Sequence, residues 1–464
     1  MRQPARIVIC GGGVAALEAL LALRELLDVG AQIELLAPNR RFVYRPMAVA
    51  EPFGLARTEL FDLAAIASRL GARLHVGRLA AVETDAHELV LDDGSRLSYD
   101  AALIAVGARS VNWLAGSCSF GGQGGDCFNE VLERLEQGAS SSVAFVCPAG
   151  ASWTLPIYEL ALLTASQEAE RGIADVELTI ITPELQPLGL FGPGAVKVMR
   201  GLLSDRGVGI RAGERVQRFH AGRLALDSGD TLAVDEVVAL ARLDGPRVPG
   251  LPSDGDGFIP IDDHCEVPGA PGVYAAGDGT SFPIKQGGLA TQQADVAAEA
   301  IAARLGAALP ASSFEPVLRA MLLTGIAPVY LRARLAGSDV AVSDVDLAVN
   351  ALWSPATKVA GRHLAPFLAD APAFEHESLH DQAPSALDAE TSRRGHEEAR
   401  ELALLFAEAD ARSGDLHSAL SWLTVVERID GVLPSGYTEK RDAWREQLRP
   451  QPEAVLSGGG ANTP

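Results

Sequence analysis

Three glycines near the start of the chain have the spacing of a phosphate-binding turn. Residues 7–16 read IVICGGGVAA and lead into a segment rich in Ala and Leu, which is typical of a helix. In a strand–turn–helix unit, Gly11 permits the tight turn, Gly13 lets the backbone approach a pyrophosphate, and Ala16 lets the helix pack closely on the strand. The helix N-terminus then offers unpaired N–H groups and the positive end of its dipole to phosphates. The pattern predicts a dinucleotide site.

The acidic residue that would bind a ribose hydroxyl is missing from the end of the next expected strand. That strand, Gln32–Leu36, carries Glu34 in its interior and runs on into Ala-Pro-Asn-Arg. We therefore expect the ribose contact to come from the backbone near Pro38 or from the side chains of Asn39 and Arg40.

Two later segments also read as strands that end in small residues. Residues 102–108 read ALIAVGA, with Ala105 and Gly107 at the turn. Residues 272–278 read GVYAAGD, which places Asp278 directly after Gly277 at a strand end, and a helix is expected to follow. With these segments in this order, residues 6–368 resemble the flavoproteins that carry two dinucleotide-binding domains. Within that group the chain is most similar to sulfide:quinone oxidoreductases and type II NADH dehydrogenases.

The resemblance implies FAD as the cofactor. In that group the carboxylate of the Ala-Gly-Asp segment binds the ribityl chain, which implies this role for Asp278. The next helix N-terminus faces the pyrimidine end of the isoalloxazine, which implies backbone contacts around Gly287, Gly288 and Leu289. A helix N-terminus suits a reduced anionic flavin, whose negative charge gathers near N1 and O2.

A second strand–turn–helix unit departs from a phosphate loop. Residues 145–156 read FVCPAGASWTLP, in which only Gly150 matches the loop. Pro148 has no N–H to donate, and Trp153 would crowd the place of a pyrophosphate. Thr154 as an N-cap and Pro156 in the first turn still start a helix well. We expect a second dinucleotide-binding fold in which NAD(P)H remains open as a donor but is disfavoured.

Two charged residues are candidate catalytic groups. By the resemblance, Glu159 matches a glutamate near the flavin and would relay protons; the alternative is an exposed helix carboxylate or a cap partner. Lys285, together with Gln286, precedes the second flavin-contacting helix and would hydrogen-bond the flavin ring. For Lys285, exposure to solvent is an equal alternative. Packing is favoured over chemistry for Trp353, Pro355 and Lys358.

The five cysteines are scattered along the chain, at Cys10, Cys118, Cys127, Cys147 and Cys265. Their odd number and wide spacing predict free buried thiols, with no disulfide framework, no redox-active pair and no metal site. The sulfide-oxidising relatives carry one cysteine at the position matching Trp153 and another beyond the Ala-Gly-Asp segment. This chain has neither, so we expect no sulfide oxidation, which needs two thiols beside the flavin.

Length, composition and charge narrow the class of protein. The chain has 464 residues, of which 48% are hydrophobic and 21% charged, as in an ordinary globular protein of about three domains. A net charge of −21 argues against binding to nucleic acid or to anionic membranes. The sequence shows no signal peptide and no uncharged run long enough to span a bilayer. We therefore expect a cytoplasmic protein.

The alternation of strands and helices predicts an α/β fold with two Rossmann-like domains and a small C-terminal helical tail. Expected helices cover residues 14–27, 62–70, 129–137 and 156–172; expected strands cover 6–10, 32–36, 74–76, 88–91, 102–105, 143–147 and 176–182. We assign residues 1–115 to the FAD-binding domain, 116–245 to the second domain, 246–370 to the rest of the flavin domain, and 371–464 to a linker and tail.

The tail is net acidic and carries two expected amphipathic helices, residues 397–412 and 417–428. In the first, Leu402, Leu405, Phe406 and Ala409 share a face. The pair resembles one tetratricopeptide-like hairpin, which is too little for a solenoid. A polar linker, 371–384, precedes it, and residues 457–464 are expected to be disordered. We expect the tail to cap the flavin domain or to contact a protein, and not to anchor the chain to a membrane.

These observations predict an FAD-dependent oxidoreductase that passes electrons from an unidentified small-molecule donor to a small acceptor such as a quinone, without a redox-active cysteine pair. The alternative is a flavin-binding regulatory or scaffold protein with little turnover.

Overall fold

The computed structural model describes residues 4–27, 30–121, 127–173, 175–336 and 341–369, together with shorter stretches between 400 and 447. The chain forms two units, Met1–Gln382 and Ala383–Pro464. We describe each unit by itself.

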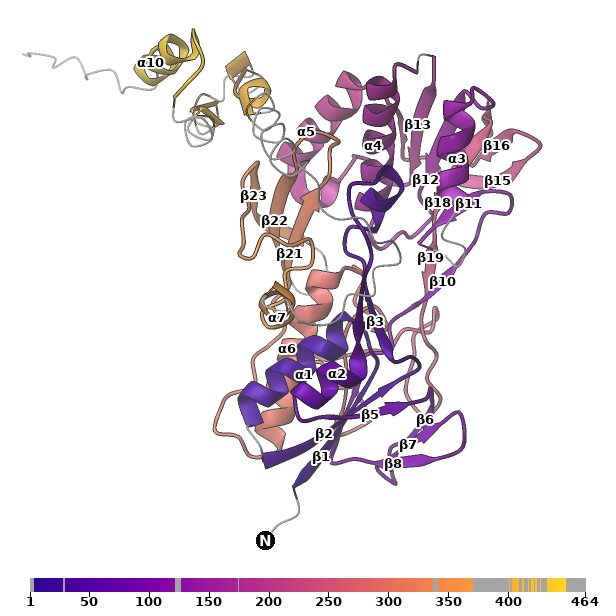
Figure 1. The fold of residues 1–464 in the computed structure, drawn as a ribbon, viewed down its shortest axis with the longest axis vertical. Helices are drawn as coiled ribbons and strands as arrows, with labels where there is room; N and C mark the ends of the chain where they lie inside the picture. The colour runs from indigo at the N-terminus through magenta and orange to yellow at the C-terminus, as the bar shows by residue number, and fades with distance from the viewer. Residues whose placement is uncertain are drawn as a thin grey trace, which may run out of the picture. The chain divides into compact units, whose positions relative to one another are not determined.

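A five-stranded parallel sheet carries the N-terminal glycine motif (Figure 1). Its strand order is β20-β9-β1-β2-β5, with bounds β1 (Ala5–Cys10), β2 (Ala31–Ala37), β5 (Arg73–Val76), β9 (Ala101–Ile104) and β20 (Val273–Ala275). Successive side chains of β1 point to opposite faces of the sheet. Ile7 and Ile9 pack with helices α1 (Val14–Leu27) and α6 (Gly287–Arg304), whereas Val8 and Cys10 pack toward a small antiparallel sheet. The side chains from Ile7 to Cys10 of β1 are therefore all buried, as a strand covered on both faces requires.

The remaining elements of this region surround the sheet. They are the hairpin β3 (Arg41–Tyr44) and β4 (Glu59–Asp62), the 3-10 helix η2 (Ala48–Phe53), α2 (Leu63–Arg69), and the antiparallel strands β6 (Leu79–Glu83), β7 (Glu88–Leu91) and β8 (Arg96–Ser98). Asp62 begins α2 by accepting the N–H of Ala64 at 2.7 Å. The expected bounds of α1 and β7 are confirmed, and those of α2 and β5 differ by one residue at one or both ends.

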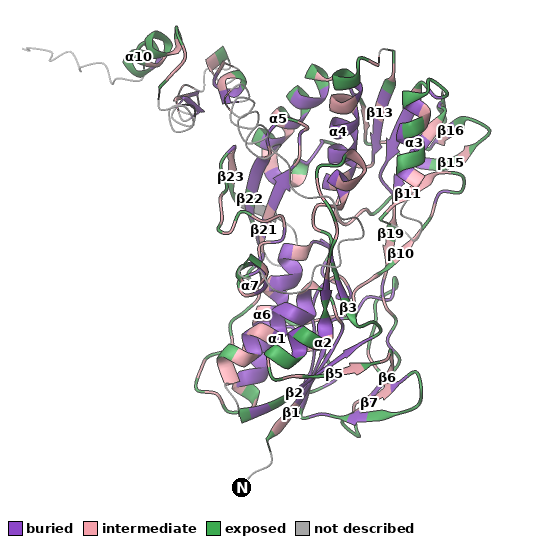
Figure 2. Ribbon diagram, in the orientation of Figure 1, coloured by how far each residue is buried: buried purple, intermediate pink, exposed green. Residues whose placement is uncertain are grey.

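A second five-stranded parallel sheet has the order β11-β18-β12-β13-β14. Its strands are β11 (Cys118–Phe120), β12 (Ser142–Val146), β13 (Glu177–Thr182), β14 (Gly209–Ala212) and β18 (Glu236–Leu240). Its helices are α3 (Cys127–Glu136), α4 (Leu155–Arg171), the short η3 (Gly189–Phe191) and α5 (Gly192–Asp205). An antiparallel sheet, β15 (Val216–His220), β16 (Arg223–Leu226) and β17 (Thr231–Ala233), packs on it. The α/β class with two Rossmann-like sheets is thus confirmed, and the strands of both sheets are largely buried (Figure 2).

The second sheet is inserted between strands of the first. The chain passes into it through β10 (Arg109–Val111) and out through β19 (Arg242–Asp244), which pair with each other. An antiparallel sheet that we did not expect then follows α6: β21 (Val317–Leu322), β22 (Val329–Ala336) and β23 (Ala341–Ala348), with α7 (Leu364–Ala369) after it.

The expectation of free cysteines is wrong for one pair. Cys118 and Cys127 form a disulfide with their Cα atoms 5.5 Å apart. They are nine positions apart in the sequence, and the first residue of β11 and the first residue of α3 lie together. The other three, Cys10, Cys147 and Cys265, are free and buried as expected.

In the second unit, Phe406 and Trp422 pack with ring centroids 4.9 Å apart, and an unexpected helix, α10 (Tyr437–Gln447), follows. Leu405, expected on the buried face, is 42% exposed, so that part of the face was assigned wrongly. Leu402, Ala409, the linker 371–384 and the residues 457–464 lie outside the described residues. None of the helices in the described part of the chain combines the length and apolar character that crossing a bilayer requires.

Candidate flavin site and adjoining cavities

A cleft of about 740 Å³ opens at the carboxyl ends of the first sheet. The glycine motif lines it through Cys10, Gly11, Gly12 and Gly13, as do Ala105 and Gly107 after β9. Gly11 has φ +143°, and a Cβ there would lie 2.1 Å from the Ala105 carbonyl oxygen, so the turn itself requires glycine. A Cβ at Gly13 would meet no atom within 4 Å. The space beside Gly13 is therefore open to a ligand, as a pyrophosphate site requires.

The ribose end of the cleft is built differently from the usual acidic pattern. Glu34 is fully buried within β2, where it accepts hydrogen bonds from Arg6 at 2.5 Å and contacts His75. It is not available to a ribose. Asn39 lines the cleft as expected, whereas Arg40 does not; Arg41 lines it instead. The contact predicted for Arg40 stays a prediction, and Arg41 is a further candidate beside it.

The Ala-Gly-Asp segment forms a fixed turn at the end of β20. The Gly277 N–H donates to Oε1 of Gln293 on α6 at 2.8 Å, and the Thr280 hydroxyl donates to the Gly277 carbonyl at 3.0 Å. Burial raises the pKa of Asp278, and the nearby Lys285 opposes this shift. None of the described residues donates a hydrogen bond to the Asp278 carboxylate. A deep carboxylate without a protein donor fits the hydroxyls of a ribityl chain, although Asp278 is not among the residues that line the cleft.

The N-terminus of α6 is capped by Gln286. Its Oε1 accepts the Leu289 N–H at 3.0 Å, and its Nε2 donates to the Arg319 carbonyl at 2.8 Å. The side chain expected to bind the flavin ring thus joins α6 to β21, and we correct its role to positioning. Gly288 follows within the first turn and is buried. The Leu289 N–H, expected to contact the flavin, is thus already bonded to the Gln286 side chain.

Lys285 is buried rather than exposed, at 7% exposure. Its Nζ donates to the carbonyls of Phe282, at 2.7 Å, and Thr280, and lies 3.9 Å from the centre of the Phe258 ring. Burial lowers the pKa of Lys285 to about 8, opposed by the charges of Asp278 and Asp254. The amine lines two cavities that meet beside it.

Glu159 forms a buried ion pair with Lys358. The Lys358 Nζ lies 2.6 Å and 2.7 Å from the two carboxylate oxygens, and the Leu323 N–H donates to Oε1 at 2.9 Å. Glu159 is 0% exposed, so the exposed-carboxylate alternative is excluded. Burial raises the pKa of Glu159, while the Lys358 charge lowers it. The ion pair of Lys358 was not foreseen, because the two residues lie 199 positions apart and no sequence spacing connects them.

Lys358 also lines an apolar cavity of about 230 Å³. The cavity lies between the second fold and the N-terminus of α6, and its walls include Trp153, Gln286, Gly287, Met321 and Val359. Small, apolar and bordered by two lysines, it suits a small planar acceptor.

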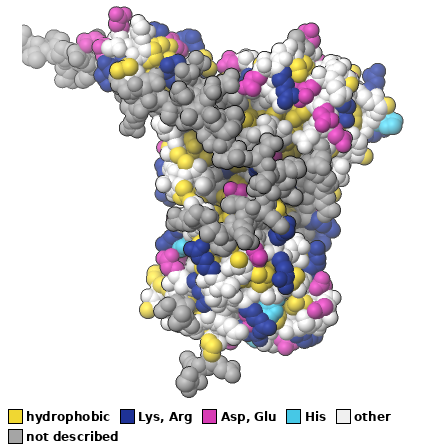
Figure 3. All heavy atoms as spheres, in the orientation of Figure 1, with side chains coloured by type: hydrophobic (Ala, Val, Ile, Leu, Met, Phe, Trp, Pro, Cys, Tyr) yellow, Lys and Arg dark blue, Asp and Glu magenta, His cyan; other side chains and the backbone are white. Residues whose placement is uncertain are grey.

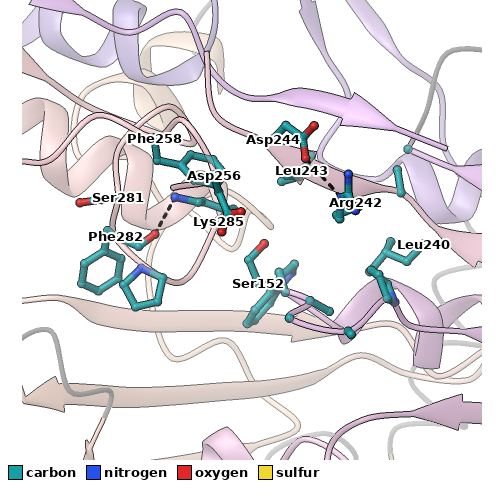
Figure 4. A pocket seen from close by; sticks show the side chains of 18 of the residues that line it. Ser152, Leu240, Arg242, Leu243, Asp244, Asp256, Phe258, Ser281, Phe282 and Lys285 are labelled. Atoms are coloured by element: carbon teal, nitrogen blue, oxygen red, sulfur yellow. Dashed lines mark hydrogen bonds and ion pairs between the residues drawn. The ribbon is translucent and has the colours of Figure 1, made fainter. Parts of the chain in front are cut away.

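A larger cavity of about 690 Å³ lies on the other side of Trp153 (Figure 4). The loop between β12 and α4 lines it from Pro148 to Trp153, opposite Phe258 and Lys285. Thr154 stands at the N-cap of α4 as expected, but its side chain makes no cap hydrogen bond and instead bonds to Glu184.

Glu184 is a functional candidate that the sequence reasoning missed. It follows the end of β13, which is the second strand of the second fold, where dinucleotide-binding folds place the acid for the adenosine ribose. Tyr158 donates to its carboxylate at 2.6 Å and Thr182 at 3.2 Å. Burial raises the pKa of Glu184, and these hydroxyls oppose the shift. The signal was the Thr-Pro-Glu run directly after an expected strand.

Comparisons with known proteins agree with this arrangement. The family model for pyridine nucleotide-disulphide oxidoreductases matches residues 5–300. An NADH dehydrogenase-like protein of Mycobacterium tuberculosis is 30% identical over 296 residues, which cover 59% of this chain and 72% of the relative. The sulfide-quinone reductase of Aquifex aeolicus is 26% identical over 215 residues, covering 43% and 47%. The X-ray structure of the sulfide:quinone oxidoreductase from Aquifex aeolicus superposes with a TM-score of 0.67 at 19% identity, covering 74% of this chain and 86% of that one. The chain thus belongs to the pyridine nucleotide-disulphide oxidoreductase family, as an oxidoreductase with FAD as its cofactor.

Proposed function

We propose that the protein passes electrons from a small donor to a small acceptor such as a quinone, and that Glu159 and Lys358 deliver a proton to that acceptor. The observation that carries the proposal is the buried Glu159–Lys358 pair, because its lysine borders the apolar cavity next to the α6 N-terminus.

Some residues of the chain would hold the FAD, and others would deliver protons to the acceptor. Gly13, Asn39 and Asp278 would hold the FAD, which supplies two-electron chemistry when bound. A quinone that takes up two electrons also takes up two protons. A carboxyl group whose pKa burial raises, paired with an amine at the cavity wall, can hold a proton at Glu159 and release it through the Lys358 amine. Lys285, with a pKa of about 8, is the second candidate proton donor.

The test compares Glu159→Gln and Lys358→Met with a matched control on the same helix. Glu168 is also on α4, is 4% exposed, and has no hydrogen-bond partner for its carboxylate. Glu159→Gln should lower kcat for quinone reduction about 100-fold, as the loss of a general acid does, and should change the pH profile. Glu168→Gln should change neither.

The outcome against the proposal is a Glu159→Gln protein with full FAD content and a kcat within threefold of the wild type. A wild-type protein that no donor and acceptor pair turns over would favour the flavin-binding regulatory alternative.

The same proposal assigns residues 1–115 and 246–370 to the flavin domain and 116–245 to the second domain. It also places the protein in the cytoplasm and gives the net acidic tail a protein-contact role.

A further inference from the structure

One tryptophan forms a wall of three separate cavities. Trp153 lines the 690 Å³ cavity beside Lys285, the apolar 230 Å³ cavity beside Lys358, and a third of about 240 Å³ that reaches Glu184. The side chain stands at the point where the chain leaves the loop after β12 and enters α4.

The indole has a fixed partner. Its ring packs edge-on against Phe191, with centroids 6.1 Å apart and an interplanar angle of 69°. Phe191 ends η3 and is 0% exposed, so it holds the indole from a buried position. An aromatic pair of this geometry is stabilised beyond the effect of its buried area, which opposes rotation of Trp153 away from the wall.

The wall that Trp153 forms crosses the path that a bound dinucleotide would take. In this kind of fold the adenosine ribose lies at the acid that ends the second strand, and the pyrophosphate crosses the N-terminus of the helix that follows the first strand. Here the acid is Glu184 and the helix is α4. The two ends of the path are the 240 Å³ and 690 Å³ cavities, which share Ala151, Ser152, Trp153 and Pro283 as their common wall.

The 240 Å³ cavity that reaches Glu184 (the Glu184 compartment) and the 690 Å³ cavity beside Lys285 differ in the size of ligand that they can hold. The Glu184 compartment is smaller than the roughly 300 Å³ at which small-molecule sites begin. The compartment beside Lys285 is well within that range. Its charged lining is balanced, with Arg242, Arg247 and Lys285 set among Asp244, Asp254 and Asp256, so it does not repel a phosphate as the net charge of the chain does (Figure 4).

We propose that Trp153 is a specificity-determining residue that divides the second dinucleotide groove. The compartment beside Lys285 accepts a ligand of mononucleotide size, and the complete dinucleotide is excluded. This inference rests on the proposed function only for the small donor, whose site we place in that compartment.

The test measures binding without turnover, so its failure would leave the Glu159–Lys358 proposal standing. Nicotinamide mononucleotide, NAD⁺ and ADP-ribose are titrated calorimetrically into the FAD-loaded wild type, Trp153→Gly and the conservative control Trp153→Phe. The wild type and Trp153→Phe should bind the mononucleotide at least tenfold more tightly than NAD⁺. Trp153→Gly should raise the affinity for NAD⁺ and ADP-ribose at least tenfold while changing that for the mononucleotide less than threefold.

Glu184 supplies a second check. Adding Glu184→Gln to Trp153→Gly should remove the gain for both adenosine-containing ligands and leave mononucleotide binding unchanged. Two results would overturn the proposal: wild-type protein that binds NAD⁺ as tightly as the mononucleotide, or Trp153→Gly protein with native Tm and FAD content whose NAD⁺ affinity is unchanged. The first of these needs no variant to fold.

Discussion

Gly11 and Gly13 belong to one motif, but the reason for a glycine differs between the two positions. A side chain at Gly11 would collide with the Ala105 backbone, whereas one at Gly13 would meet only empty space in the protein. The first glycine is therefore required by the fold and the second by the ligand.

Gly13→Asp should fold but lose FAD, because a carboxylate would occupy the pyrophosphate path with the wrong charge. Gly30→Asp is the control, since Gly30 is exposed and also has no atom within 4 Å of a Cβ. Absorbance at the flavin bands, normalised to protein, measures the FAD content. Wild-type stoichiometry in Gly13→Asp would contradict the assignment of the cleft.

Asp278→Asn should weaken FAD binding about 10- to 100-fold, as the loss of a charge-assisted hydrogen bond does. Fluorescence titration of the apoprotein with FAD gives the dissociation constant. An unchanged constant would mean that Asp278 makes no contact with the cofactor.

The protein should not oxidise sulfide with a quinone as acceptor. Its free thiols are buried, and burial raises the pKa of Cys10 to about 12 and raises that of Cys147 and Cys265 as well, which leaves little reactive thiolate. Sulfide-dependent quinone reduction is compared between wild type and Cys118→Ser/Cys127→Ser. Wild-type activity that the double variant lacks would identify the disulfide as a redox centre.

Sequence motifs located the turns that carry Gly11, Gly13 and Asp278 better than the contacts that hold the site in place. These turns depend on local chain geometry, which short motifs record. The Glu159–Lys358 pair and the cap at Gln286 depend on a lysine and a carbonyl supplied by distant strands and loops. The Cys118–Cys127 bond depends on how a strand start and a helix start meet. Such contacts are tertiary and leave no spacing to read.

At the scale of elements, the predicted bounds of helix α1 agree with the structure, because its apolar run is long and has a clear end. The β21–β23 sheet was missed, although β22 alternates buried and exposed side chains from Leu331 to Leu335. That alternation of apolar residues with arginine is the period of a half-buried strand, and it was available in the sequence.

Helices α1, α6 and α7 meet at a buried acidic pair, which consists of Glu18 and Asp295. Glu18 of α1 accepts the N–H groups of His363 and Leu364 at the start of α7, at 2.8 Å and 2.7 Å. Burial and the Glu18 charge raise the pKa of Asp295 on α6 to about 8, and Arg362 opposes this. His363, Glu25 and Glu299 also face the pair.

The contribution of Asp295 to protein stability should therefore fall as pH rises from about 4 to about 8. The folded protein keeps a proton on Asp295 below about pH 8, whereas an unfolded Asp loses it near pH 4. In that window the folded state binds more protons, so the unfolding free energy decreases with pH, by at most about 1.4 kcal/mol per unit from this site. Denaturant unfolding at several pH values should give a flatter curve for Asp295→Asn. Parallel curves for the two proteins would show that Asp295 titrates normally.

At the scale of the whole molecule, the net charge determines which charged surfaces attract or repel the protein. Basic and acidic side chains are interspersed on the face shown in Figure 3, and the chain carries −21 overall. An anionic bilayer therefore repels the protein at long range.

When the protein is mixed with anionic liposomes at low salt and the liposomes are floated, the protein should stay in the bottom fraction and not rise with them. Neutral liposomes serve as the control for apolar adsorption. Salt-sensitive binding that is lost when residues 371–464 are deleted would show that the tail anchors the protein to the membrane.

The insertion of the second sheet into the first also sets an order of assembly. During synthesis, β1, β2 and β9 emerge early, but their edge partner β20 and the helix α6 follow only after the whole inserted sheet. The inserted sheet draws all its strands from residues 118–240 and can close first, whereas β20 pairs with β9 across 171 positions, from Ala102 to Val273. Long-range parallel pairing of this kind is slow to form. We therefore expect FAD to bind only after β20 and α6 have joined the sheet that carries the glycine motif.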